Sequence, residues 1–266
     1  MKVYVNEKLK YIEDNTTLMQ LKSEIKKNAD VIVYNGFIVK KDIKLKEHDS
    51  IVFIKKGEIP KKEEMEAQLV SRHTPEVHNR VKKVSVGIAG LGGLGSNAAV
   101  SLARIGIGRL LLVDFDVVEP SNLNRQYYFV KNVGMKKTNA LKEIIGEVNP
   151  FVKIDTLDTF IDENNVQHIF KDVDIIVEAF DNPVSKAVLI NTVLTKMKDK
   201  KIIGASGMAG YFSSNTIVTR KVNGNFYLVG DGENEAAPGS GLMAPRVTIA
   251  ANHEANAVLR MIMEER

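Results

Sequence analysis

The chain has 266 residues, which is enough for one large domain and one small domain. Its formal net charge of +4 arises from intermixed basic and acidic residues, which argues against a dedicated nucleic-acid-binding surface. Cysteine is absent, which excludes disulfides, zinc–thiolate sites and a cysteine nucleophile. No apolar run approaches the ~18 residues of a membrane span, and the N-terminus shows no signal-peptide core, so we expect a cytoplasmic protein.

The first 56 residues are predicted to form a small domain of short strands around one helix. Apolar and polar residues alternate in the first two strands, which is typical of a hairpin with one buried face. Asn35-Gly36 separates two apolar runs and predicts a tight turn. In chain order, the predicted elements are strands at 3–5 and 9–11, a helix that follows residues 15–17 and ends near 25, strands at 31–34 and 37–39, and a strand at 51–54.

This order of elements resembles the β-grasp fold of ubiquitin-like sulfur carriers such as ThiS. Those carriers end in a free Gly-Gly tail whose terminal carboxylate is activated. Here the last strand continues into Lys55-Lys56-Gly57-Glu58-Ile59-Pro60, so a peptide bond stands where the carboxylate would be. We interpret residues 1–56 as a ThiS-like domain that is no longer a carrier, and residues 57–80 as a charged, helix-prone linker or entry segment.

Residues 84–116 combine a strand, a glycine turn, a helix, a second strand and an acid. A β-branched run leads into Gly90-Leu91-Gly92-Gly93-Leu94-Gly95, an alanine-rich helix follows, and a second apolar run ends at Asp114. Glycines let the backbone approach a phosphate, and the helix N-terminus offers free N–H groups to the anion. An acid after the second strand can bind ribose hydroxyls. This stretch predicts a nucleotide site without identifying the nucleotide.

Strands and helices then alternate, which predicts a doubly wound, mostly parallel sheet in a large α/β domain over residues 81–266. Gly90–Gly95, Asp114, Asp181 and Ser206 all follow strands, and ligands of such sheets lie at the carboxyl ends. The predicted elements after residue 136 are a helix to 148, a strand at 152–156, a helix at 161–170, a strand at 174–179, a helix at 184–197, a strand at 201–205, antiparallel strands at 213–220 and 225–229, a mobile loop at 231–244 and a helix at 247–264.

Five segments together carry a family resemblance. GLGGLGS, LLVDFD, EPSNLNRQ, VGMKK and AFDNP, in this order and spacing, resemble the adenylating enzymes of the ubiquitin-activating superfamily, whose simplest members are bacterial ThiF and MoeB. The match spans about residues 72 to 264, and with the N-terminal domain it looks closest to ThiF proteins that carry a fused ThiS-like domain. The resemblance implies ATP and Mg²⁺ as ligands. No zinc is expected, because the four zinc-binding cysteines of several relatives are absent.

The resemblance also implies roles for individual residues. Asp114 would bind the ribose hydroxyls, Asn122, Arg125 and Lys137 the phosphates, and Asp181 the magnesium ion, with Arg125, Lys137 and Asp181 catalytic. Further nucleotide-binding positions are Gly90, Gly92, Gly93, Gly95, Asp116, Gln126 and Asn182, with Gln126 supporting Arg125.

Alternatives remain open at several of these positions. Asp114 and Arg125 could form a structural ion pair, and Lys137 could be a surface residue of its helix. Asp116 could be a loop hydrogen-bonding residue. Asp181-Asn182-Pro183 could be a helix cap with proline in the first turn, a role that is compatible with binding.

An arginine that reaches across a dimer is a further implication. Related enzymes insert an arginine of the partner subunit, located early in the domain, into the phosphate site. Arg72 is favoured over Arg80 because a reaching side chain suits a loop on a mobile entry segment. The expected assembly is therefore a homodimer, in which each site borrows a side chain.

The leading functional hypothesis is ATP-dependent adenylylation of the C-terminal glycine of a separate ThiS-like carrier, with release of pyrophosphate, in thiamine (thiazole) biosynthesis. Without cysteine, the chemistry should stop at the acyl-adenylate, and a separate protein should donate the sulfur. One alternative is adenylation of another carboxylate, on a different carrier or on a modified tRNA base. Another is a non-catalytic module that binds nucleotide or carrier. A plain NAD-dependent oxidoreductase is disfavoured, because no hydride-site pattern follows the glycine turn.

Overall fold

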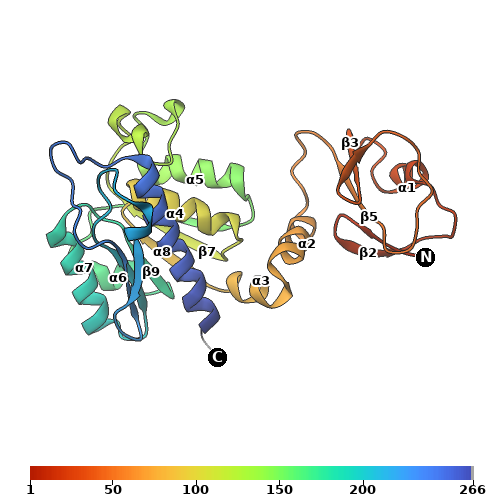
Figure 1. The fold of residues 1–266 in the computed structure, drawn as a ribbon. Helices are drawn as coiled ribbons and strands as arrows, with labels where there is room; N and C mark the ends of the chain where they lie inside the picture. Colours follow the sequence, from red (N-terminus) through yellow and green to blue (C-terminus); the bar gives the residue numbers. More distant parts are fainter. Residues whose placement is uncertain (265–266) are drawn as a thin grey trace. The chain divides into compact units, whose positions relative to one another are not determined.

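The computed structural model describes residues 1–264, which form two compact units, residues 1–78 and the chain from residue 79 onward (Figure 1). Within the described residues, no helix combines the length and apolar character that crossing a bilayer requires.

The first unit is a five-stranded sheet with the strand order β2-β1-β5-β3-β4. The neighbours β1 and β5 are parallel, and all other neighbouring strands are antiparallel. This sheet and its helix are the predicted β-grasp arrangement. The elements are β1 (Lys2–Val5), β2 (Lys8–Tyr11), α1 (Leu18–Ile25), β3 (Val31–Tyr34), β4 (Phe37–Val39) and β5 (Ser50–Ile54).

Local sequence explains the ends of these elements. Thr17 caps α1 through a capping box, in which its side chain accepts from the Gln20 amide and the Gln20 side chain accepts from the Thr17 amide. Asn35 and Gly36 both have positive φ, as a two-residue hairpin turn between β3 and β4 requires. The alternating residues of the strands bury one face against α1, including Val3, Ile51 and Phe53.

The predicted entry segment at 57–80 contains two helices, α2 (Lys62–His73) and most of α3 (Pro75–Val81). Thr74 separates them with a positive φ, followed by a proline, which cannot continue the hydrogen bonding of a preceding helix. Arg72 therefore lies in the last turn of α2. The expectation that Arg72 lies in a loop is wrong.

The second unit is a seven-stranded sheet with the strand order β11-β12-β10-β9-β6-β7-β8. All neighbours are parallel except β11 and β12, which confirms the doubly wound fold. Its regular elements are β6 (Ser85–Ala89), α4 (Gly93–Arg104), β7 (Arg109–Asp114), α5 (Lys137–Val148), β8 (Lys153–Asp158), α6 (Val166–Phe170), β9 (Ile175–Glu178), α7 (Pro183–Lys196), β10 (Lys201–Ala205), β11 (Val218–Lys221), β12 (Phe226–Gly230) and α8 (Ala244–Glu264), with short 3₁₀ turns at Pro120–Asn124, Val130–Asn132 and Ser214–Thr216.

One detail of this unit goes beyond the prediction and another differs from it. The strands β11 and β12 are antiparallel, as predicted, and β12 also runs parallel to β10 and so extends the main sheet. Residues 213–217 were expected to be extended and instead contain a 3₁₀ turn. Alternation of apolar residues indicates a strand but not the direction of its neighbour, so the sequence could not decide the first point.

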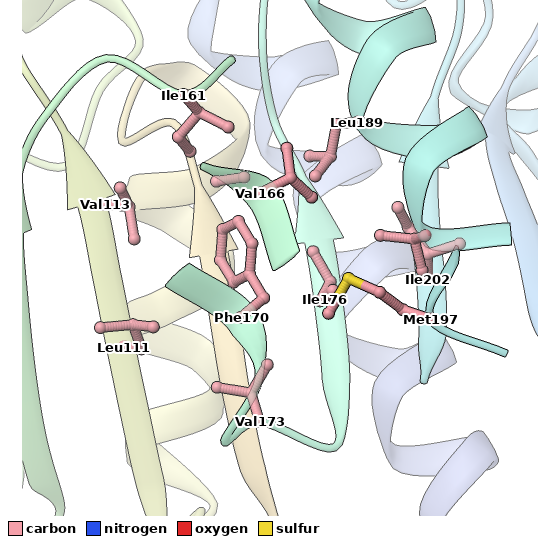
Figure 2. Packing of buried hydrophobic residues seen from close by; sticks show 12 residues of the cluster. Leu111, Val113, Ile161, Val166, Phe170, Val173, Ile176, Leu189, Met197 and Ile202 are labelled. Carbon is pink, nitrogen blue, oxygen red and sulfur yellow. The ribbon is translucent and has the colours of Figure 1, made fainter. Parts of the chain in front are cut away.

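Helices cover both faces of the sheet. On one face, α6 and α7 bury a cluster that includes Phe170, Val173, Leu189 and Ile176 (Figure 2). On the other face lie α4, α5 and α8, of which α4 and α8 pack against each other. After β8 the chain crosses back past β6 to place β9 on its other side. The crevice at such a reversal of strand order is where ligands of doubly wound folds bind.

Candidate functional site

The turn between β6 and α4 is held in a tight, glycine-dependent conformation. Gly90 has a φ of +89°, and a Cβ atom added at Gly95 would lie 1.9 Å from the Gly90 carbonyl oxygen. Gly95 therefore lets the first turn of α4 close onto the Gly90 peptide. The result is a helix N-terminus with free backbone amides directed at the carboxyl end of the sheet.

A cavity of about 750 Å³ lies at this end of the sheet. Residues that follow β6, β7, β9 and β10 line it, together with the first turns of α4, α5 and α7. The structure brings most of the predicted site residues to this one cavity, namely Gly90, Gly92, Gly93, Asp114, Asp116, Arg125, Gln126, Lys137, Asp181 and Asn182.

Asp114 connects the end of β7 to the glycine turn. One carboxylate oxygen accepts from the Leu91 amide at 2.6 Å and the other from the Asp116 amide at 2.8 Å. The side chain is buried. Each oxygen has a further lone pair, so Asp114 can still accept from a ligand hydroxyl at the cavity wall.

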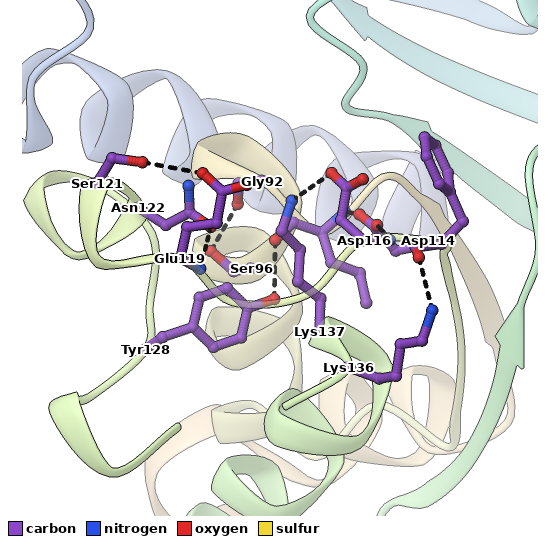
Figure 3. A network of polar contacts seen from close by, with 12 residues as sticks. Gly92, Ser96, Asp114, Asp116, Glu119, Ser121, Asn122, Tyr128, Lys136 and Lys137 are labelled. Carbon is purple, nitrogen blue, oxygen red and sulfur yellow. Dashed lines mark hydrogen bonds and ion pairs between the residues drawn. The ribbon is translucent and has the colours of Figure 1, made fainter. Parts of the chain in front are cut away.

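Lys137 is the first residue of α5, and its side chain is buried rather than on the surface. Its ammonium contacts the Asp116 carboxylate at 2.7 Å, and its backbone amide donates to the Asp116 carbonyl (Figure 3). Asp116 itself is exposed. The pair therefore holds a cation at the cavity wall with an acid that solvent and ligand can both reach.

The segment from Glu119 to Tyr128 folds against the glycine turn (Figure 3). The Tyr128 hydroxyl donates to the Leu91 carbonyl at 2.8 Å, and the Tyr127 amide donates to the Ser96 hydroxyl at 2.9 Å. Asn122 is buried, and its side-chain oxygen accepts from the Glu119 amide at 3.0 Å, so it shapes this segment and does not line the cavity.

Arg125 and Gln126 project from this segment into the cavity. The aliphatic part of Arg125 covers Gly93, and its guanidinium bonds are to the Asn124 side chain at 2.8 Å and the Ser121 carbonyl at 3.3 Å. These bonds do not involve Asp114, so the structure gives no support to the alternative of an Asp114–Arg125 ion pair. The Gln126 side-chain oxygen is buried and has no hydrogen-bond partner among the described residues.

Asp181 lies exposed between β9 and α7. The next residue, Asn182, caps α7 by accepting from the Val184 and Ser185 amides at 2.9 and 3.0 Å, and Pro183 opens the helix. The prediction that this segment caps α7 is therefore confirmed. It leaves the Asp181 carboxylate free to face the cavity.

The two candidate arginines lie in different settings. Arg80 donates to the carbonyls of Ile262 and Met263 at the end of α8, where a cation satisfies free helix carbonyls. Arg72 belongs to the first unit, and the cavity to the second.

Several cavity residues were not singled out from the sequence. Phe115 and Phe160 make an edge-to-face contact at the rim, with centroids 5.3 Å apart, and both are about half exposed. Lys186 of α7 also lines the cavity and pairs with the buried Glu178. An acid inside an otherwise apolar predicted strand was the available signal for Glu178. Asn234, Glu235 and Leu242 come from the loop that precedes α8.

The residues present fit a nucleotide and a hard cation bound together. The cavity wall offers glycine amides, the cations of Arg125, Lys137 and Lys186, and the aromatic rings of Phe115 and Phe160. Within the described residues no group of three or more His, Cys, Asp or Glu side chains could hold a metal by itself. A single carboxylate such as Asp181 suits Mg²⁺ when phosphate oxygens and water supply the remaining ligands.

Comparisons with known proteins point in the same direction. The ThiF family model matches residues 65–266, and the model of ThiS-like ubiquitin matches residues 1–57. The chain is 36% identical over 130 residues to the adenylyltransferase and sulfurtransferase UBA4 of Candida glabrata, covering 48% of this chain and 30% of that protein. It is 37% identical over 128 residues to the adenylyltransferase and sulfurtransferase MOCS3 of Drosophila virilis, covering 48% and 28%. The matches span less than a third of each relative.

Among solved structures, the fold is similar to that of the E. coli tRNA N6-threonylcarbamoyladenosine dehydratase TcdA, determined in complex with ATP. The TM-score is 0.66 with 23% sequence identity, and the match covers 74% of this chain and 92% of that chain. At this identity the likeness concerns the fold.

Proposed function

Because the chain belongs to the ThiF family, we propose that it is an ATP-dependent adenylyltransferase that activates the C-terminal glycine of a separate ThiS-like sulfur-carrier protein. The observation that carries the proposal is one cavity that unites the glycine turn, Arg125, Lys137 and Asp181. The family relation and the ThiS-like match to residues 1–57 support a carrier of this class, and with it a role in thiamine (thiazole) biosynthesis.

In the proposed reaction, a carboxylate oxygen of the carrier attacks the α-phosphorus of ATP. The new oxygen–phosphorus bond gives an acyl-adenylate, and pyrophosphate leaves with the electron pair of the broken bond. Both reactants are anions, so the protein contributes chiefly by neutralising charge and by positioning. Mg²⁺, when bound, would stabilise charge on the phosphate oxygens.

In our proposal, the cations of the cavity supply most of the charge neutralisation. Arg125 can swing its guanidinium from Asn124, an exposed partner, to a phosphate, with its stem fixed over Gly93. The Lys137 ammonium uses one of its three N–H donors on Asp116, so the others can donate to a phosphate. Asp181 would hold the magnesium ion, and the first amides of α4 would meet the phosphates.

The nucleoside would lie along the β7 end of the cavity. Asp114 is fixed by two backbone amides and would accept from the ribose hydroxyls. Phe115 and Phe160 line the same part of the cavity, and their half-exposed rings suit the face or edge of a base.

The reaction would end at the acyl-adenylate. The chain has no cysteine to take over the activated glycine, so we expect another protein to donate the sulfur. We also propose that Arg72 enters the phosphate site of a second copy, which would make the homodimer the active form, since Arg80 is engaged at the end of α8.

An ATP–pyrophosphate exchange assay tests the proposal. Exchange should depend on an added ThiS-like carrier and should vanish when the carrier lacks its terminal glycine. Arg125→Ala and Asp181→Ala should abolish exchange in folded protein. ATP binding without exchange would instead favour a nucleotide-binding module, and normal exchange in either variant would remove that residue from the mechanism.

A further inference from the structure

A buried ion pair lies beneath the Asp181 loop. Glu178 is the last residue of β9 and is 0% exposed, whereas Lys186 lies in the first turns of α7 and is partly open to the cavity. The Lys186 ammonium donates to both Glu178 oxygens, at 2.8 and 2.6 Å. Because one cation meets both oxygens, the end of the strand and the start of the helix are joined at a fixed separation.

This pair closes a short loop that contains Asp181. The Phe180 amide also donates to Glu178, at 2.8 Å, which fixes the residue directly before Asp181. On the other side, the Asn182 cap fixes the residue directly after it. Asp181 is thus held from both sides, although its own carboxylate remains exposed.

A second buried acid lies near the pair. Glu254 of α8 is 0% exposed, and neither of its carboxyl oxygens has a hydrogen-bond partner among the described residues. Burial, and the nearby Glu178 charge, raise the pKa of Glu254, with Lys186 opposing the shift. Burial raises the pKa of Glu178 as well, but Lys186 and the Phe180 amide oppose that shift by donating to its carboxylate. Because Glu254 has no such donors among the described residues, we assign the charge to Glu178 and the proton to Glu254.

We propose that the Glu178–Lys186 pair is a positioning device that presents the Asp181 carboxylate for magnesium. The inference rests on the proposed function for the identity of the metal–nucleotide ligand. It assigns to Glu178 and Lys186 no contact with the reacting atoms. Its direct consequence is the Mg²⁺ dependence of ATP binding.

Calorimetric titration of the full chain with ATP, across a series of Mg²⁺ concentrations, tests this inference. Glu178→Gln and Lys186→Met should raise the Mg²⁺ concentration that gives half-maximal enhancement of ATP affinity about tenfold, as is common when a partner of a metal ligand is lost. ATP affinity without Mg²⁺ should change less than twofold. Lys186→Arg should retain the wild-type Mg²⁺ dependence of ATP affinity, because a guanidinium can also donate to both Glu178 oxygens.

Glu254→Gln is the matched control, since it replaces a neutral acid by a neutral amide of the same shape and should leave the Mg²⁺ dependence unchanged. If a single variant does not fold, the double variant Glu178→Gln/Lys186→Met decides the case, because it leaves no unpaired buried charge. A merely structural pair would lower the unfolding midpoint without moving the Mg²⁺ dependence, and that result overturns the inference.

The outcome is separable from the proposed function. Absence of carrier-dependent exchange would refute the adenylation proposal while the binding titration still reports on the pair. Conversely, intact exchange with unaltered Mg²⁺ dependence in the variants would refute only the positioning role.

Discussion

Replacing Gly95 by alanine tests whether the glycine turn is as tightly constrained as the structure indicates. The added Cβ would lie 1.9 Å from the Gly90 oxygen, a separation that real Cβ atoms do not adopt. The Gly90 peptide would have to move by about 1 Å, because an overpacked backbone contact of this kind relaxes only by displacement. That shift separates the Leu91 amide from Asp114, a bond now 2.6 Å long.

The expected magnitude follows from that bond. A hydrogen bond to a charged group contributes about 1.5–3 kcal/mol. If ATP binding needs the hydrogen bond between the Leu91 amide and Asp114, Gly95→Ala should raise the Kd for ATP between about tenfold and a hundredfold. Calorimetric titration measures the Kd, and differential scanning calorimetry measures the stability of the same sample.

Gly146→Ala provides the control, because Gly146 lies within α5 and an added Cβ would meet no atom within 4 Å. Alanine should stabilise that helix by up to about 1 kcal/mol and leave the Kd for ATP unchanged. Wild-type affinity and an unchanged melting temperature in Gly95→Ala would refute the reasoning, since the turn would then have room that the structure denies it.

Three further predictions concern stability. Arg246→Met removes the cation that pairs with the buried Asp231 carboxylate, which keeps only neutral donors from Glu233 and Asn234, so we expect a loss of about 3–5 kcal/mol in urea unfolding. Arg260→Met, in an exposed pair, should leave the midpoint within error. Because the folded-state pKa of Glu254 is raised, its stabilising contribution is complete below the ordinary glutamate pKa of 4.5 and is lost as the pH rises through the folded value. Glu254→Gln should therefore gain stability over the wild type with increasing pH, and parallel pH profiles would contradict this. Thr17→Ala removes the α1 cap and should cost the first unit about 1 kcal/mol, as measured by its thermal unfolding, and an unaltered transition would show that the cap is unnecessary.

The sequence by itself determined the features that local periodicity and turn chemistry control. The alternation in residues 3–11, the Asn35-Gly36 turn and the run from β6 through Gly90–Gly95 to Asp114 each specify their own backbone conformation within a few residues. The carboxyl ends of parallel strands meet at one edge, so the convergence of the glycine turn, Asp114 and Asp181 followed as well. The sequence indicated Lys137 as a site residue, but it could not predict that this side chain is buried or that it pairs with Asp116.

Only the tertiary structure decided the contacts between segments that lie far apart in the chain. Arg80 meets the carbonyls of Ile262 and Met263, and the approach of α8 to the sheet brings Glu254 near Glu178. The parallel pairing of β12 with β10 could not be predicted from the sequence either, because the pattern of a strand indicates which face is buried and not which strand lies beside it. These features depend on how helices pack across the sheet, and no short stretch of sequence encodes the distance between two such surfaces.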